Sequence, residues 1–145
     1  MKKKILLAIF SVGAGMAFTF FFLNKENTFA KEEYLIYAFQ VGAFEKYDNA
    51  VNLSNLLPSS IIKKEDNLYK IYVAMYKDID IVNKMIVYFE NNNINIFLKS
   101  LSVSKNFYND LLNYETLIKN SEDTNVYNKV NQSILNLYLE SMKNE

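Results

Sequence analysis

The chain has 145 residues, half of them hydrophobic, and its sixteen basic and sixteen acidic side chains give a formal net charge of zero. It contains neither Cys nor His, which excludes disulfides, thiol nucleophiles, Cys/His metal sites and every catalytic mechanism with imidazole as its base. All of the basic residues are Lys, so the guanidinium groups that often hold phosphate or carboxylate in a bidentate manner are missing too. A chain of this length is expected to bury one compact core.

An uncharged apolar segment lies near the N-terminus. Three lysines precede residues 5–23, which carry no charge and are long enough to cross a bilayer as one helix. After this segment thirteen lysines face sixteen acidic residues, a net charge of about −3. These features predict a single-pass cell-membrane anchor over residues 1–23, with the N-terminus cytoplasmic and the C-terminal domain extracytoplasmic. Secretion after cleavage near Ala30, which ends a small-x-small sequence, is the alternative. The acidic balance argues against a nucleic-acid partner.

A short polar linker at residues 24–33 leads into the first of two strand-turn-helix units. Apolar alternation predicts a strand over residues 34–43, and an apolar stripe predicts a helix over residues 47–57, which Pro58 ends. The bulkier side of the strand is the predicted core face and consists of Leu35, Tyr37, Phe39 and Val41.

The second unit follows a short predicted strand at residues 59–64. Alternation returns over residues 68–75, and helical spacing of apolar side chains predicts a helix over residues 79–91 with Asp78 as its N-cap. A final strand is expected from residue 94 to about 103. Two such halves predict one α+β domain of βαββαβ order over residues 34–103, because each half alone leaves an apolar sheet face uncovered.

The remaining residues, 104–145, are predicted to form a C-terminal helical extension. One amphipathic pattern runs from Phe107 to Ile118 and a second from Val126 to Met142. Such helices pack on the domain or on each other, or they dock a partner.

Two short segments carry a family resemblance. The sequence QVGAF at residues 40–44 and the strand LYKIYVA at residues 68–74, with the helices that follow them, resemble the SPOR domain, the sporulation and cell-division repeat of bacterial envelope proteins. The resemblance implies a ferredoxin-like or RNP-like four-stranded antiparallel sheet, whose exposed face binds septal peptidoglycan glycan strands stripped of their stem peptides. It implies neither cofactor nor metal. The chain departs from the family pattern where Ala43 replaces Ser and where Lys70 and Tyr72 replace Arg. It also departs where the sequence Ala74-Met75-Tyr76 replaces Gly-Pro-Phe.

In a βαββαβ sheet the first and third strands lie side by side, so Gln40 and Tyr72 are expected to be neighbours on the open face. The amide would bond to sugar hydroxyl and acetamido groups, and the ring would stack on a sugar face. Lys70 or Lys99 would meet the lactyl carboxylate of muramic acid. The alternatives are that Gln40 satisfies backbone groups, that Tyr72 packs under a C-terminal helix and that the lysines are solvated. C-terminal helices over this face would block glycan binding.

Two functions therefore stay open. The first is a membrane-anchored, non-catalytic peptidoglycan-binding module of division or sporulation septa. The second is an envelope module that keeps the fold and binds a protein through its sheet or its C-terminal helices. An enzyme is not expected, because acidic pairs such as Asp78 with Asp80 fall in polar turns or linkers.

Overall fold

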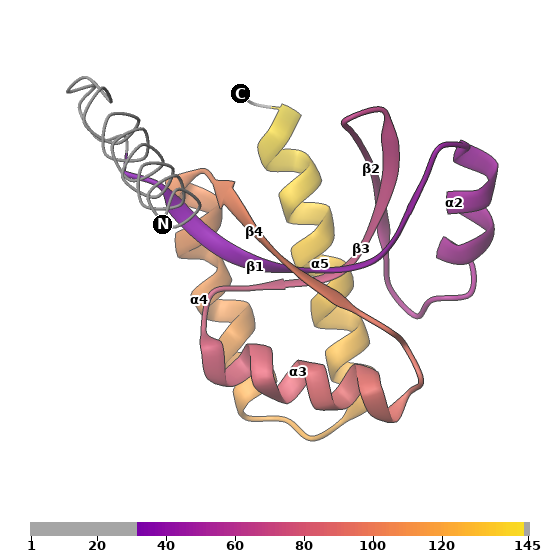
Figure 1. The fold of residues 1–145 in the computed structure, drawn as a ribbon. Coiled ribbons are helices and arrows are strands. Elements are labelled where there is room, and N and C mark those ends of the chain that lie inside the picture. The colour runs from indigo at the N-terminus through magenta and orange to yellow at the C-terminus, as the bar shows by residue number, and fades with distance from the viewer. Residues whose placement is uncertain (1–31, 144–145) are drawn as a thin grey trace, which may run out of the picture. The chain divides into compact units, whose positions relative to one another are not determined.

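The computed structural model describes residues 32–143 and gives eight elements in this stretch. Their bounds are β1 (Tyr34–Phe44), α2 (Tyr47–Ser54), β2 (Ile61–Glu65), β3 (Leu68–Tyr76), α3 (Ile79–Asn91), β4 (Phe97–Val103), α4 (Lys105–Lys119) and α5 (Thr124–Lys143). The described residues form an α+β fold with a four-stranded antiparallel sheet and four helices (Figure 1). The predicted membrane segment, residues 1–23, lies outside the described residues. Within residues 32–143 no helix is both long and apolar enough to cross a bilayer.

The sheet has the strand order β2-β3-β1-β4, with β1 and β3 at its centre as the sequence predicted. Asp66 and Asn67 form the tight turn between β2 and β3 and both have positive φ, 51° and 64°, which Asp and Asn tolerate better than most residues. The pairing of β1 with β3 is irregular on either side of Gln40. Such bulges increase the local twist of the sheet.

Helices α2 and α3 each contact the sheet through an aromatic ring. The ring of Tyr47 in α2 lies 5.3 Å from that of Tyr69 in β3, and the ring of Phe89 in α3 lies 5.6 Å from that of Phe39 in β1. Phe89, Phe39 and their neighbours are buried in one continuous core. The helix α3 has the bounds that the sequence predicted, and Asp78 is its N-cap, accepting a hydrogen bond of 2.8 Å from the backbone N–H of Asp80.

Helices α4 and α5 also pack on the sheet. Tyr34 at the start of β1 has its ring 5.3 Å from that of Tyr108 in α4, and Lys63 of β2 donates a hydrogen bond to Tyr138 of α5. Helix α5 packs against β3 (Figure 1). The C-terminal helices are therefore part of the same compact unit as the sheet, which begins at Tyr34.

Part of the predicted core is wrong, because β1 buries other side chains than those predicted. Leu35 and Tyr37 were expected inside, but 50% and 36% of their surfaces are exposed, whereas Ile36 and Ala38 are fully buried. Both sets of side chains in this strand are apolar, so alternation alone does not decide which set faces inward. The docking of α4 beside β1 decides it in favour of Ile36 and Ala38. Phe39 is buried as predicted, because α3 covers its side of the sheet.

Candidate functional site

The register of the central strands brings two of the predicted site residues together. Gln40 lies directly opposite Tyr72 across β1 and β3, which confirms the predicted pairing. Directly paired residues of antiparallel strands point to the same side of a sheet. We call this side the polar sheet face; its members are Gln40, Ile61, Lys63, Glu65, Lys70 and Tyr72.

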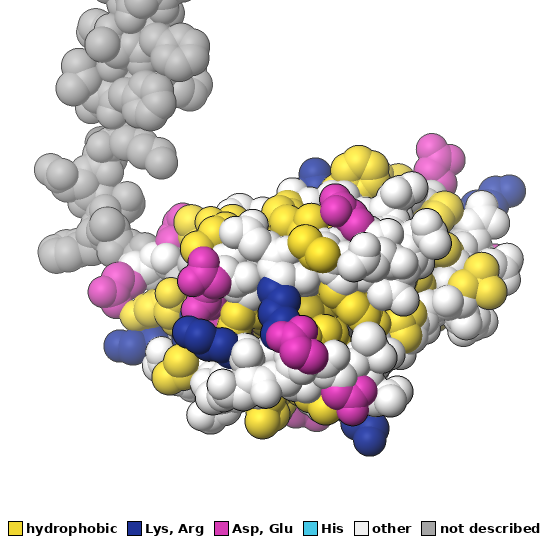
Figure 2. All heavy atoms as spheres, turned by 90° about the horizontal axis from the view of Figure 1, so that it is seen from below, with side chains coloured by type: hydrophobic (Ala, Val, Ile, Leu, Met, Phe, Trp, Pro, Cys, Tyr) yellow, Lys and Arg dark blue, Asp and Glu magenta, His cyan; other side chains and the backbone are white. Residues whose placement is uncertain are grey.

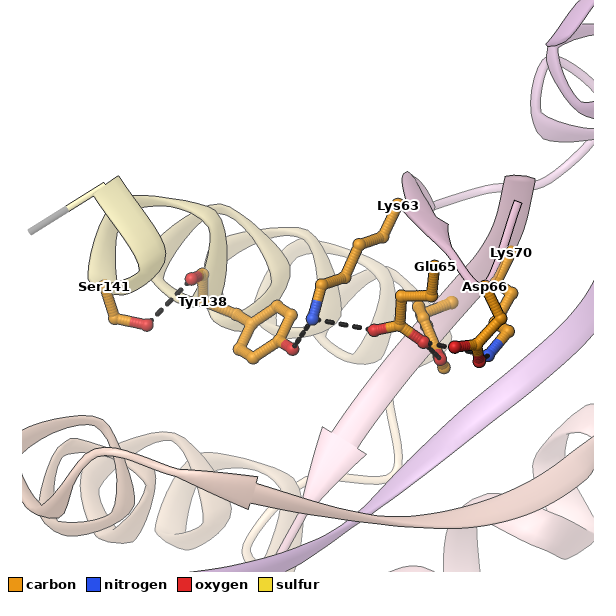
Figure 3. Close-up of polar contacts among 7 residues, drawn as sticks. Lys63, Glu65, Asp66, Lys70, Tyr138 and Ser141 are labelled. Carbon is orange, nitrogen blue, oxygen red and sulfur yellow. Dashed lines mark hydrogen bonds and ion pairs between the residues drawn. The ribbon is translucent and has the colours of Figure 1, made fainter. Parts of the chain in front are cut away.

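Glu65 is at the centre of the charged part of this face. Its carboxylate forms ion pairs with Lys63 at 2.7 Å and Lys70 at 3.1 Å, and it accepts a hydrogen bond of 3.1 Å from the hydroxyl of Tyr72. Lys70 also pairs with Asp66 at 3.1 Å. Figure 3 shows these side chains gathered between the β2–β3 hairpin and helix α5.

The ion pairs shift the pKa values of Glu65 and Lys63. Burial alone would raise the pKa of Glu65, but the hydrogen bonds from Lys63 and Lys70 outweigh it and lower that pKa below its ordinary value. Burial alone would lower the pKa of Lys63, and its hydrogen bonds to Glu65 and Tyr138 raise it instead. Burial and then the charge of Glu65 raise the pKa of Tyr72, so its phenol stays protonated. The face therefore presents a carboxylate, two ammonium groups and a neutral phenol.

The polar sheet face is not open, contrary to the expectation from the sequence. Only 1% of the surface of Tyr72 and 8% of that of Gln40 are exposed. Helix α5 lies over this face, and Lys63 joins the two by donating to the hydroxyl of Tyr138 at 2.7 Å, with its Nζ 5.1 Å from the centre of that ring. A C-terminal helix over Tyr72 was the alternative that the sequence left open, because the amphipathic stripe of a helix does not specify the surface it covers.

The two predicted lysines differ in position. Lys70 belongs to the ion-pair cluster, with 18% of its side chain exposed. Lys99 is exposed on the edge strand β4, opposite Ala38 and on the same side of β1 as Gln40. The structure therefore joins Gln40, Tyr72 and Lys70 and leaves Lys99 at the margin of the face.

Two buried amide atoms have no hydrogen-bond partner among the described residues: Oε1 of Gln40 on the sheet and Nδ2 of Asn131 in α5. Asn131 is fully buried, and its Oδ1 accepts a hydrogen bond from the hydroxyl of Tyr76. Buried amide groups in folded proteins are nearly always paired. Sequence reasoning missed Asn131, Lys63 and Glu65; the lysine and the glutamate follow from the register of the β2–β3 hairpin once its two-residue turn is recognised.

The face of the molecule seen in Figure 2 carries no concentrated block of one charge. In the view of Figure 2, lysines and carboxylates lie next to one another among hydrophobic and neutral side chains. Within residues 32–143 no group of acidic side chains is arranged to hold a metal ion. What the polar sheet face does offer is an amide, a phenol and paired charges, a set suited to a ligand rich in hydroxyl and amide groups.

Comparison with known proteins finds no significant match to a family model, to a curated protein or to a solved structure. The resemblance to the SPOR domain stays a prediction.

Proposed function

We propose that this chain is a non-catalytic, membrane-anchored module that binds denuded septal peptidoglycan glycan strands through the polar sheet face, during cell division or sporulation. The observation that supports this most directly is the register of the central strands, which pairs Gln40 with Tyr72 and sets Lys70 two residues along β3. The amide of Gln40 has an acceptor oxygen with no partner, so it keeps hydrogen-bonding capacity for a ligand.

Each side chain has a role that fits a glycan. The Gln40 amide pairs with an acetamido group, the Tyr72 ring packs on the apolar face of a sugar, and Lys70 and Lys99 attract the lactyl carboxylate of muramic acid. These roles need no bond to be made or broken. The three lysines before residues 5–23 support an anchor that holds this domain on the extracytoplasmic side of the membrane.

The second candidate is an envelope module that binds a protein instead. It is favoured by the burial of Tyr72, which lies on the face that α5 covers. The departures from the family pattern at Lys70 and Tyr72 favour it too. Under this hypothesis the sheet and its own C-terminal helices form a permanent core, and a partner uses surfaces that stay exposed.

Cosedimentation with purified cell-wall sacculi tests the proposal. The fragment from residue 32 to 145, which contains the complete compact unit, is mixed with untreated sacculi and with sacculi stripped of stem peptides by an amidase. We expect preferential binding to the stripped material, weakened at least tenfold by Gln40→Ala. The matched control is Asn83→Ala, which removes an exposed amide from α3 and should leave binding unchanged.

Equal binding by the two amide variants would remove Gln40 from the site. If neither the wild-type fragment nor Leu135→Ala, which truncates a buried side chain of α5, binds either material, glycan binding is rejected and the protein-binding module is left.

A further inference from the structure

Helix α5 occupies the face that the proposed function needs, so a glycan strand and the closed position of α5 compete for the same surface. We propose that α5 is an autoinhibitory cap, which lies on the polar sheet face in the resting protein and is displaced when a glycan strand binds. This inference rests on the proposed function, since the glycan is the ligand that displaces the helix. It adds a regulatory step to the same site.

One buried side chain of the sheet and one of α5 each keep an unpaired polar atom in the closed protein. On the sheet Gln40 is more than nine-tenths buried with its Oε1 unpaired, and in α5 Asn131 is fully buried with its Nδ2 unpaired. Each of these atoms has lost its water without gaining a protein partner, which lowers the stability of the closed protein. Opening returns both atoms to water, and the glycan then supplies a donor to Gln40.

The charged side chains of the polar sheet face keep their ion-pair partners when α5 is displaced. Lys63 is the charged residue of the sheet that bonds to α5, through Tyr138, and it keeps its ion pair with Glu65 at 2.7 Å when that bond is broken. Lys70 keeps its pairs with Glu65 and Asp66. Displacement of α5 therefore breaks the hydrogen bonds that Lys63 and Tyr76 donate to it. It does so without exposing an uncompensated buried charge, which would be far more costly.

The connection of α5 to the rest of the fold allows it to move without the strands. It is the last described element and is joined to α4 by residues 120–123. Lys84 of α3 holds the start of this connection, donating to the backbone carbonyls of Ile118 and Ser121 at 3.1 and 2.7 Å. The start of α5 is held against α3 as well, because the hydroxyl of Tyr88 donates to Asn128 at 2.8 Å. The proposed opening therefore moves the part of α5 that follows Asn128. The buried side chains of α5 that keep the cap closed without ligand include Val130, Ile134 and Leu135.

Hydrogen exchange detects the cap directly. Without ligand we expect amides of α5 to exchange at least tenfold faster than those of β1 and β3, because α5 opens without global unfolding. Glycan strands from amidase-treated sacculi should then make α5 exchange faster still while they slow exchange in β1 and β3. A ligand that bound outside a permanent core would leave α5 unchanged or more protected.

A reversible cross-link tests whether opening is required. The chain contains no cysteine, so Lys63→Cys with Tyr138→Cys creates a unique pair that a short, reducible bismaleimide can join across the contact. The control pair, Asn136→Cys with Glu140→Cys, places both cysteines on exposed positions of α5. We expect the cross-link at Lys63 and Tyr138 to weaken binding to stripped glycan at least tenfold, reduction to restore it, and the control cross-link to have no effect.

The outcomes separate the cap from the proposed function. If the cross-linked and reduced proteins bind stripped glycan equally well, the function holds and the cap is wrong. If no form binds glycan, the proposed function fails. The exchange rates without ligand then decide whether α5 opens separately from the strands. Equal rates in α5, β1 and β3 would overturn the cap.

Discussion

Gln40 combines a central position in the sheet with an acceptor oxygen that nothing in the described residues satisfies. Met has nearly the same shape as Gln and no polar end, so Gln40→Met removes the cost of the unpaired oxygen and keeps the packing. An unsatisfied buried acceptor costs about 1 to 3 kcal/mol, and we expect the free energy of unfolding to rise by about 1 kcal/mol. Urea unfolding measures this change, and sedimentation with stripped sacculi should show that binding is lost.

For this interpretation to hold, Gln40→Met must raise the free energy of unfolding and at the same time lose binding to stripped sacculi. A loss of stability in Gln40→Met would mean that the amide is paired within the fold and has a structural role. Gln40→Ala serves as the comparison, since it removes the amide but also leaves a cavity, so it should be the less stable of the two variants.

Glu65 makes the free energy of unfolding depend on pH in the acidic range. Its pKa in the folded protein is lowered from 4.5 by Lys63 and Lys70, against the effect of burial. Between 4.5 and the lowered value the unfolded chain binds a proton that the folded chain does not, so stability falls as the pH drops through this window. In Glu65→Gln this contribution is absent, and the fall in stability below pH 4.5 should be shallower. Urea unfolding between pH 6 and pH 3 measures both proteins; parallel curves would show that the ion pairs have no part in acid sensitivity.

At the scale of elements, the sequence predicted the order of strands and helices and the central pairing of β1 with β3. Period-two alternation and a helical stripe are local signals, and Asp78 marks the start of α3 by a local hydrogen bond. The side of β1 that faces inward and the surface under α5 could not be predicted. Both depend on the docking of helices far along the chain, and Leu35 and Ile36 are equally apolar.

Helix α4 has a further role that no local pattern indicates. Glu115 is almost fully buried, and its Oε1 accepts hydrogen bonds from the backbone N–H groups of Lys77 and Asp78 at 2.6 and 2.8 Å. This side chain supplies the hydrogen-bond acceptor for two backbone N–H groups at the junction between β3 and α3. The first N–H groups of a helix have no partner within the helix itself. We expect Glu115→Ala to lower the free energy of unfolding by about 2 to 3 kcal/mol. Glu90→Ala, at an exposed position of α3, is the control and should change it by less than about 0.5 kcal/mol.

At the scale of the whole molecule, the core runs without interruption from the sheet into α4 and α5, so stability and access to the polar sheet face are linked. Leu111 in α4 and Leu135 in α5 make a matched pair, because both are leucines with no exposed surface. Truncating either to Ala should cost roughly 2 to 5 kcal/mol of packing where it contacts the core. The cap hypothesis makes their functional effects differ.

Leu111→Ala weakens a helix that stays in place, so urea unfolding should show lower stability with glycan binding unchanged. Leu135→Ala weakens the closed position of α5 and so raises the fraction of molecules whose polar sheet face is exposed. Apparent affinity scales with that fraction, and we expect binding to stripped glycan to strengthen several-fold in a protein that is less stable. A permanent core predicts the reverse, because there a destabilising substitution has no route to better binding. If Leu135→Ala binds no better than Leu111→Ala at equal stability, α5 belongs to the core and the sheet face is not the binding surface.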